Sequence, residues 1–119
     1  MNETPLELVT SAESGEAEIV VTPDGFSTRL SGRELFCVLW SDVREIRAYK
    51  RDLLATDLIC LGFRDSEDDR YREVHEEMTG FDLLRARLAE AFPTIPTRWF
   101  EDAAHPAFAT NLAVLFRRG

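Results

Sequence analysis

The sequence lacks the residue spacings that assign many small proteins to a chemical class. It has two cysteines and two histidines, with no CxxC, HExxH or HxH spacing of the kind that zinc sites use. It also has no GxSxG nucleophile elbow, no glycine-rich phosphate loop and no GxGxxG fingerprint. We therefore predict no catalytic residue, no metal site and no cofactor.

Long apolar runs are missing as well. None approaches the roughly 18 residues that a membrane-crossing helix needs, and the first ten residues have neither the positive charge nor the apolar stretch of a secretory signal. The 119 residues, 45% of them apolar and 30% charged, fit one globular domain with its own core. We expect a single domain over residues 1–119 that is cytoplasmic.

Positive charge is scarce. Fourteen lysines and arginines face 22 aspartates and glutamates, so the formal net charge is -8. Binding to nucleic acid or to an anionic membrane surface needs clustered cations. We therefore predict no nucleic-acid partner and no membrane partner, and expect a protein or peptide instead.

The two cysteines each lie inside an apolar run that is typical of a strand. Cys37 belongs to the run 35–40, and Cys60 belongs to the run 58–63. A free cysteine behaves as a small buried hydrophobe, and disulfides are rare in a reducing compartment. We expect two buried thiols rather than a disulfide.

Residues 17–75 alternate between apolar and polar positions and are interrupted by turn residues. Pro23-Asp24-Gly25 predicts a turn in which proline fixes φ and Gly25 supplies a positive φ, and Ser31-Gly32 predicts a second tight turn. Trp40-Ser41-Asp42 predicts a bend, and Gly62 indicates a bulge or a close approach by a neighbour. The alternation predicts antiparallel strands at 18–22, 26–30, 34–40, 43–51, 58–64 and 71–75.

An amphipathic helix is predicted at about 80–92. Its apolar stripe recurs every three or four residues, at Phe81, Leu84, Leu88 and Phe92. Thr79 and Asp82 fit a capping box at its start, and Pro93 ends it.

The two ends of the chain are less regular. Residues 1–16 are polar and acidic, which predicts a loosely held arm before the strand-rich region and helix of residues 17–92. Residues 93–119 are expected to form an extension that packs on the core. Residues 107–117 fit either a final strand or a second helix, although Pro106 argues against a long helix.

Cations around the predicted bend and the strand after it are the first candidate binding site. Arg44, Arg47, Lys50 and Arg51 follow Trp40 closely, and Arg29 and Arg33 lie on the preceding hairpin. Of these cations we select Arg29, Arg44, Arg47 and Lys50 as the candidate site. If their side chains converge, they could hold an acidic peptide or a phosphorylated group. The alternative is that they pair with the many carboxylates of the chain itself.

Trp99 and Phe100 are the second candidate surface, because an adjacent aromatic pair suits an interface. The alternative is that they anchor their segment to the core. Of the remaining polar groups, His75 is expected at a solvated strand end and His105 in a loop. Asp65–Asp69 is expected to be a solvated hairpin tip.

Residues Glu18–Phe92 resemble a bacterial pleckstrin-homology-like domain. The resemblance rests on the turn-linked strands, on the helix, and on Trp40-Ser-Asp-Val…Ile46, which is similar to the W-x-D-I-x-x-I element of these domains. It implies an α+β fold in which a strongly bent antiparallel sheet, or a partly open barrel of six or seven strands, is closed by one amphipathic helix. The basic loops with which eukaryotic members bind phosphoinositides are missing here, so that activity is not implied.

Three functions remain open from the sequence. The first, which we favour, is a noncatalytic domain that binds a protein or peptide or associates with itself. The second is an immunity-type acidic inhibitor of a basic toxin, with Glu13–Glu18 and Asp65–Asp69 as its binding face. The third is a small enzyme that uses polar residues such as His75, Asp42 or Tyr49.

Overall fold

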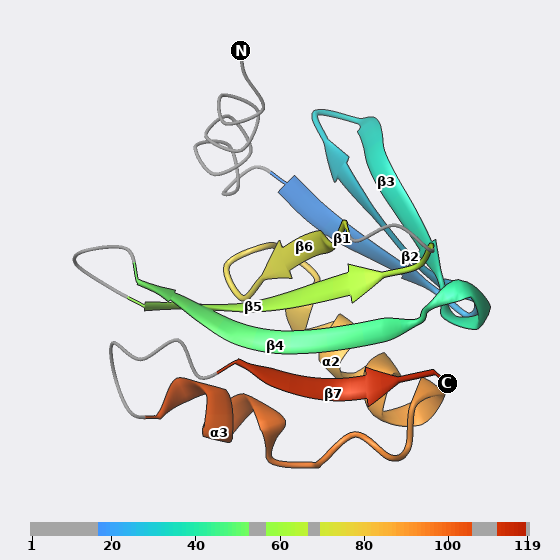
Figure 1. Cartoon of the computed structure of the whole chain (residues 1–119). Helices are drawn as coiled ribbons and strands as arrows, with labels where there is room; N and C mark the ends of the chain where they lie inside the picture. Colours follow the sequence, from blue (N-terminus) through green and yellow to red (C-terminus); the bar gives the residue numbers. More distant parts are fainter. Residues whose placement is uncertain (1–16, 53–56, 67–69, 106–111, 119) are drawn as a thin grey trace.

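A computed structural model of the chain describes residues 17–52, 57–66, 70–105 and 112–118 (Figure 1). The predicted acidic arm at 1–16 and part of each predicted loop at 52–57 and 65–69 lie outside these residues. The predicted α+β class is confirmed. The elements are β1 (Ala17–Thr22), β2 (Gly25–Leu30), β3 (Arg33–Leu39), the 3-10 turn η2 (Trp40–Asp42), β4 (Glu45–Asp52), β5 (Asp57–Arg64), β6 (Arg72–His75), α2 (Phe81–Ala91), α3 (Trp99–Ala104) and β7 (Ala113–Arg117).

The seven strands form two antiparallel sheets. One sheet has the order β1-β2-β3, and the other has the order β6-β5-β4-β7. Neither sheet is closed or strongly curled, so the strongly bent sheet or partly open barrel expected from the sequence is not formed. The reason lies in β4, whose two edges are occupied by β5 and by β7. The preceding strand β3 therefore cannot pair with it and continue one sheet.

The two early turns differ in how they use glycine. Ser31 and Gly32 have φ angles of 53° and 79°, which suits a two-residue hairpin turn. Gly25 does not have the positive φ that we predicted. It is required instead because a Cβ atom there would lie 2.0 Å from the carbonyl oxygen of Val38 on β3.

Helix α2 lies within the predicted range and buries three residues of the predicted stripe, Phe81, Leu84 and Leu88. The predicted capping box is wrong. The N-cap residue is Gly80, with a φ of 93° and no side-chain hydrogen bond. Thr79 is used differently, because its carbonyl oxygen accepts a 2.7 Å hydrogen bond from the backbone N–H of Ile19 on β1.

The segment after α2 contributes a helix and a strand. Trp99 and Ala103 of α3 are buried, and Leu115 of β7 is buried as well. The sequence left residues 107–117 open between a strand and a helix. Residues 113–117 form a strand, β7, which pairs antiparallel with β4. Among the described residues, no helix is long and apolar enough to cross a membrane.

An aromatic cluster connects the two sheets with each other and with the end of α2. The Phe26 ring lies 4.9 Å from that of Phe63 and 5.8 Å from that of Trp40, measured between centroids. The Phe92 ring, just after α2, lies 5.8 Å from that of Trp40 and 4.6 Å from that of Phe116. The core therefore includes residues from both ends of the described chain.

The two cysteines differ in burial. Cys60 is buried as predicted, whereas Cys37 is exposed, which corrects the prediction that both thiols are buried. Val38, the neighbour of Cys37 on β3, is fully buried. Because side chains alternate along a strand, Cys37 faces outward.

We expect Leu88→Asp to unfold the protein, since it would place an unpaired carboxylate at a position that is 0% exposed. Chemical denaturation should show a loss of more than about 4 kcal/mol in the free energy of unfolding. Leu83→Asp is the matched control, because Leu83 lies on the same helix and is 49% exposed. A Leu88→Asp variant as stable as the control would contradict the placement of α2.

Candidate functional site

Strand β4 presents different chemistry on its two faces. Ile46 and Ala48 are buried in the core. Residues two apart share a face of a strand, so Glu45, Arg47, Tyr49 and Arg51 lie together on the opposite, outer face. Arg47 and Lys50 are three residues apart and therefore point to opposite faces.

Lys50 lies on the inner face of β4, where its side chain contacts other parts of the fold. It is 4% exposed, and its Nζ donates a 2.9 Å hydrogen bond to the carbonyl oxygen of Ala104, the last residue of α3. The carboxylate of Asp57 lies 3.5 Å from the same Nζ. These contacts attach the end of α3 to the four-stranded sheet.

Arg29 and Arg44 lie apart from Arg47 and from Lys50. Arg29 is on β2, in the other sheet, where its side chain donates to the carbonyl oxygen of Gly32 at 3.5 Å. Arg44 precedes β4 and lines a polar hollow of about 340 Å³ with Ser41, Asp42, Asp65, Ser66 and Arg118. The four cations predicted as one site, Arg29, Arg44, Arg47 and Lys50, therefore do not converge.

The placement of Trp99 and Phe100 favours the anchoring alternative. Trp99 is only 8% exposed, and its ring centroid lies 5.6 Å from that of Phe100. The guanidinium of Arg85 on α2 lies 3.9 Å from the centroid of the Phe100 ring. The aromatic pair thus fixes α3 against α2, next to a hollow of about 380 Å³ between α2 and residues 93–99.

On the outer face, three arginines surround one buried carboxylate. The side chain of Glu45 is 4% exposed, and its oxygens lie 2.5 Å from Nε of Arg47, 3.5 Å from Nη2 of Arg64 and 3.6 Å from Nε of Arg117. These arginines come from β4, β5 and β7. One negative charge faces three positive charges, so the cluster carries an excess of two positive charges.

The Glu45 carboxyl stays ionised. Burial by itself raises its pKa, but hydrogen bonds with Arg47 and Tyr71 and the charges of Arg47 and Arg117 outweigh burial and lower the pKa to about 2. The guanidinium of Arg47 also lies 4.6 Å from the centroid of the Tyr71 ring. Both contacts restrict the side chain of Arg47, which remains 34% exposed.

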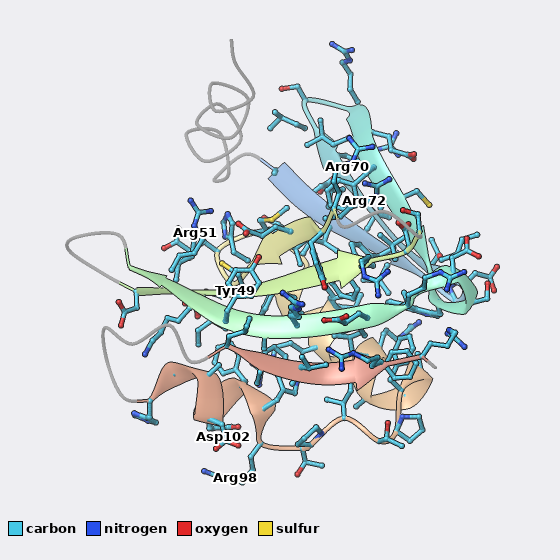
Figure 2. All side chains as sticks on the ribbon, in the orientation of Figure 1. Tyr49, Arg51, Arg70, Arg72, Arg98 and Asp102 are labelled. Atoms are coloured by element: carbon cyan, nitrogen blue, oxygen red, sulfur yellow. The ribbon has the colours of Figure 1, made fainter. Side chains whose placement is uncertain are left out.

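A second polar cluster lies further along the same face (Figure 2). The Tyr49 hydroxyl donates a 2.5 Å hydrogen bond to Glu73, and Nη1 of Arg51 donates a 2.7 Å hydrogen bond to the other oxygen of Glu73. Gly62 separates the two clusters, since a Cβ atom there would lie 3.3 Å from the Tyr49 ring and 3.4 Å from the Tyr71 ring. The close approach predicted at Gly62 is confirmed.

Together the two clusters form a positively charged strip, which we call the arginine face. From Glu45 to Arg51 it extends about 20 Å, because a strand rises about 3.4 Å per residue. Its net charge is positive although the chain has a net charge of -8. Its charged residues are Arg47, Arg51, Arg64 and Arg117, with Glu45 and Glu73 between them.

Sequence reasoning missed Arg64 and Arg117 as members of this face. Both pair in register with Glu45, one on β5 and the other on β7. Alternation along β5 places Arg64 on the same face as Gly62, and that signal was present in the sequence. No local signal places β7 beside β4, because the two strands are far apart in the chain.

A third group of titratable residues lies on the outer face but is buried. Cys60 pairs in register with Tyr49 on one side and His75 on the other, and His75 is 6% exposed. The solvated position predicted for His75 is therefore wrong, because it lies inside the sheet register and its Nδ1 accepts a hydrogen bond from the backbone N–H of Glu77.

Burial sets the protonation of this group. It raises the pKa of the Cys60 thiol to about 12 and lowers the pKa of His75. It also raises the pKa of Tyr49, with a further contribution from the charge of Glu73. All three side chains are therefore neutral at pH 7. In the described part of the chain, no group of three His, Cys, Asp or Glu residues is placed to hold a metal ion.

Similarity to known proteins does not assign a function to this chain. No protein-family model, no curated protein and no solved structure matches it. The resemblance of Trp40–Ile46 to pleckstrin-homology-like domains stays a prediction. The most distinctive chemical feature of the described residues is the arginine face.

The ionised Glu45 should make stability depend on acid pH. Its pKa is lowered from 4.5 to about 2, so its contribution is complete above pH 4.5 and is lost as the pH falls towards 2. We expect Glu45→Gln to reduce the free energy of unfolding at pH 7, and expect this difference to shrink between pH 4.5 and pH 2. Thermal unfolding across that range measures it.

The control is Glu90→Gln, which alters a carboxylate on α2 that is 75% exposed. Its stability should follow that of the unaltered protein across the whole range. A Glu45→Gln difference that is constant with pH would contradict the ionised, buried carboxylate.

Proposed function

We propose that this chain is a noncatalytic binding domain that recognises an acidic, extended segment of a partner protein on its arginine face. The observation that carries the proposal is the gathering of Arg47, Arg51, Arg64 and Arg117 on one sheet face of a strongly acidic chain. Clustered guanidiniums bind carboxylates and phosphates through paired, charge-assisted hydrogen bonds.

The arginines are held in place before any partner binds. Glu45 lies beneath one group of them, and Glu73 holds Arg51 at the other end of the face. Arg51 and Arg117 nevertheless remain 40% and 61% exposed at their side chains. Side chains that are already ordered lose less entropy on binding, so the internal carboxylates favour capture of external ones.

The shape of the face favours an extended ligand. The strip follows β4 and is about 20 Å long, which matches about six residues of an extended peptide. A partner segment with acidic residues along that length would reach both the Glu45 cluster and Arg51.

The neighbouring titratable groups support a noncatalytic role. A cysteine nucleophile needs a thiolate, and burial raises the pKa of Cys60 to about 12. The Tyr49 hydroxyl is engaged with Glu73, and burial raises its pKa too.

We further propose a distant relationship to pleckstrin-homology-like domains. It is supported by the order of elements, in which three strands, the turn at Trp40–Asp42, three more strands and a helix follow one another. On this proposal β7 is the addition that distinguishes the chain from such domains.

The binding proposal is tested with a fluorescein-labelled peptide of six glutamates, whose binding is followed by fluorescence anisotropy. We expect the unaltered protein to bind it, and expect added salt to weaken binding because the attraction is electrostatic. The double variant Arg51→Glu/Arg117→Glu should bind at least about tenfold more weakly.

The matched control is Arg33→Glu/Arg98→Glu, which makes the same change in net charge at two exposed arginines outside the arginine face. It should bind the peptide about as well as the unaltered protein. Equal loss in both double variants would mean that only net charge matters, and that result, or the absence of binding by the unaltered protein, would overturn the proposal.

A further inference from the structure

Strand β3 lies at the margin of the three-stranded sheet (Figure 1). Its described strand partner is β2, on one side only. The opposite margin of this sheet is β1, which is partly covered because Glu18 forms a bridge with Thr79. The edge of β3 thus offers backbone N–H and C=O groups to a further strand.

The features that commonly protect an edge strand are confined to the start of β3. Natural edge strands are commonly guarded by lysine, proline, inward-pointing charges or β-bulges, and β3 has one bulge, at Leu35, where its register against β2 shifts. Here the charged residues Arg33 and Glu34 are confined to the start of the strand, and the other five residues, 35–39, are all apolar or cysteine. Leu35 is 48% exposed and Leu39 is 43% exposed.

The same five residues are self-complementary in one antiparallel register. With Cys37 on a two-fold axis, Leu35 of one copy lies opposite Leu39 of the other, and Phe36 lies opposite Val38. Residues 36–39 follow the bulge in regular register with β2, and Leu35 is exposed like Leu39, so in this arrangement exposed residues meet exposed ones and inner residues meet inner ones. A register centred on Phe36 would instead place Arg33 opposite Leu39, and Glu34 opposite Val38.

We propose that two copies of this chain pair through the edge of β3 that no described strand occupies, antiparallel and with Cys37 at the two-fold axis, to make a continuous six-stranded sheet. This two-fold contact is closed, so it yields a dimer and not a fibre. The interface is small and belongs to the weak, reversible class. It involves a different sheet from the arginine face and does not depend on the function proposed above.

The charge of the chain helps to distinguish a local effect at β3 from a general effect of net charge on dimer formation. Each copy has a net charge of -8, so two copies repel one another and added salt should strengthen the dimer. Leu35→Lys reduces that repulsion, yet it would place a charge opposite Leu39 of the other copy. Weaker association of this variant therefore cannot result from net charge.

The control is Val20→Lys, which makes the same change in charge. Val20 lies on β1, is 36% exposed, and shares the outer face of the sheet with Cys37 because both pair in register with Ser27. Pairing at the β3 edge should tolerate this variant. The competing arrangement, in which the outer faces of two sheets stack, should be weakened by Val20→Lys.

Sedimentation velocity over a concentration series measures the association. We expect a concentration-dependent dimer for the unaltered protein and for Val20→Lys, and a Kd at least about tenfold higher for Leu35→Lys. Circular dichroism confirms that each variant is folded. A monomer at all concentrations would overturn the proposal, and so would a dimer that Val20→Lys abolishes or that Leu35→Lys leaves intact.

Mild oxidation then tests the register. Directly opposed strand residues have Cα atoms about 5 Å apart, within disulfide range, whereas stacked sheets lie about 10 Å apart. We expect a disulfide-linked dimer that is lost in Cys37→Ser and kept in Cys60→Ser, since Cys60 is buried. The Cys37→Ser variant should still sediment as a reversible dimer. A dimer that does not crosslink through Cys37 would overturn the proposed register.

Discussion

The buried carboxylate of Glu45 is the contact on which the arginine face depends, because it forms ion pairs with arginines from three different strands. Arg47 lies on β4, Arg64 on β5 and Arg117 on β7, close to the end of the chain. Removing one partner of a buried charge cluster commonly costs about 3–5 kcal/mol, because the remaining charges stay desolvated. The same contact keeps the guanidiniums together at a density that their mutual repulsion would otherwise oppose. Stability and the candidate site therefore share one interaction.

The position of β7 determines the rest of the architecture. By occupying the second edge of β4, it prevents β3 from joining the four-stranded sheet and leaves the strands in two sheets. It also supplies Arg117 to the arginine face. Among the described strands, the position of β3 at a sheet edge and the third arginine of the Glu45 cluster are thus two consequences of one pairing. Because the aromatic contact between Phe92 and Phe116 also belongs to this segment, the same strand connects the sheet to the end of α2.

Much of the local structure could be predicted from the sequence, and the long-range pairing could not. The spacing of Phe81, Leu84 and Leu88 was enough to place α2, since a helix buries residues three and four apart. The outer position of Cys37 was hidden because its neighbours Phe36 and Val38 are apolar too, and alternation identifies a buried face only where polar residues mark the other one. The separation of Arg47 from Lys50 was predictable, because three residues along a strand lead to the opposite face. The pairing of β4 with β7 joins Glu45 to Arg117, and no local pattern encodes a contact across that separation.

Charge is distributed unequally over the described surface, and the two proposed surfaces fit that distribution. The acidic chain gathers an excess of positive charge on the outer face of the four-stranded sheet, and the edge strand β3 of the other sheet exposes Leu35 and Leu39. On these proposals an acidic partner binds the arginine face through charge, whereas a second copy, which net charge repels, binds through short-range apolar and backbone contacts at β3. A two-fold dimer would carry two arginine faces on one rigid assembly. An acidic partner with two such segments, or with one long segment, would then bind with an effective concentration set by the spacing of the faces, so that two weak contacts together give a more stable complex.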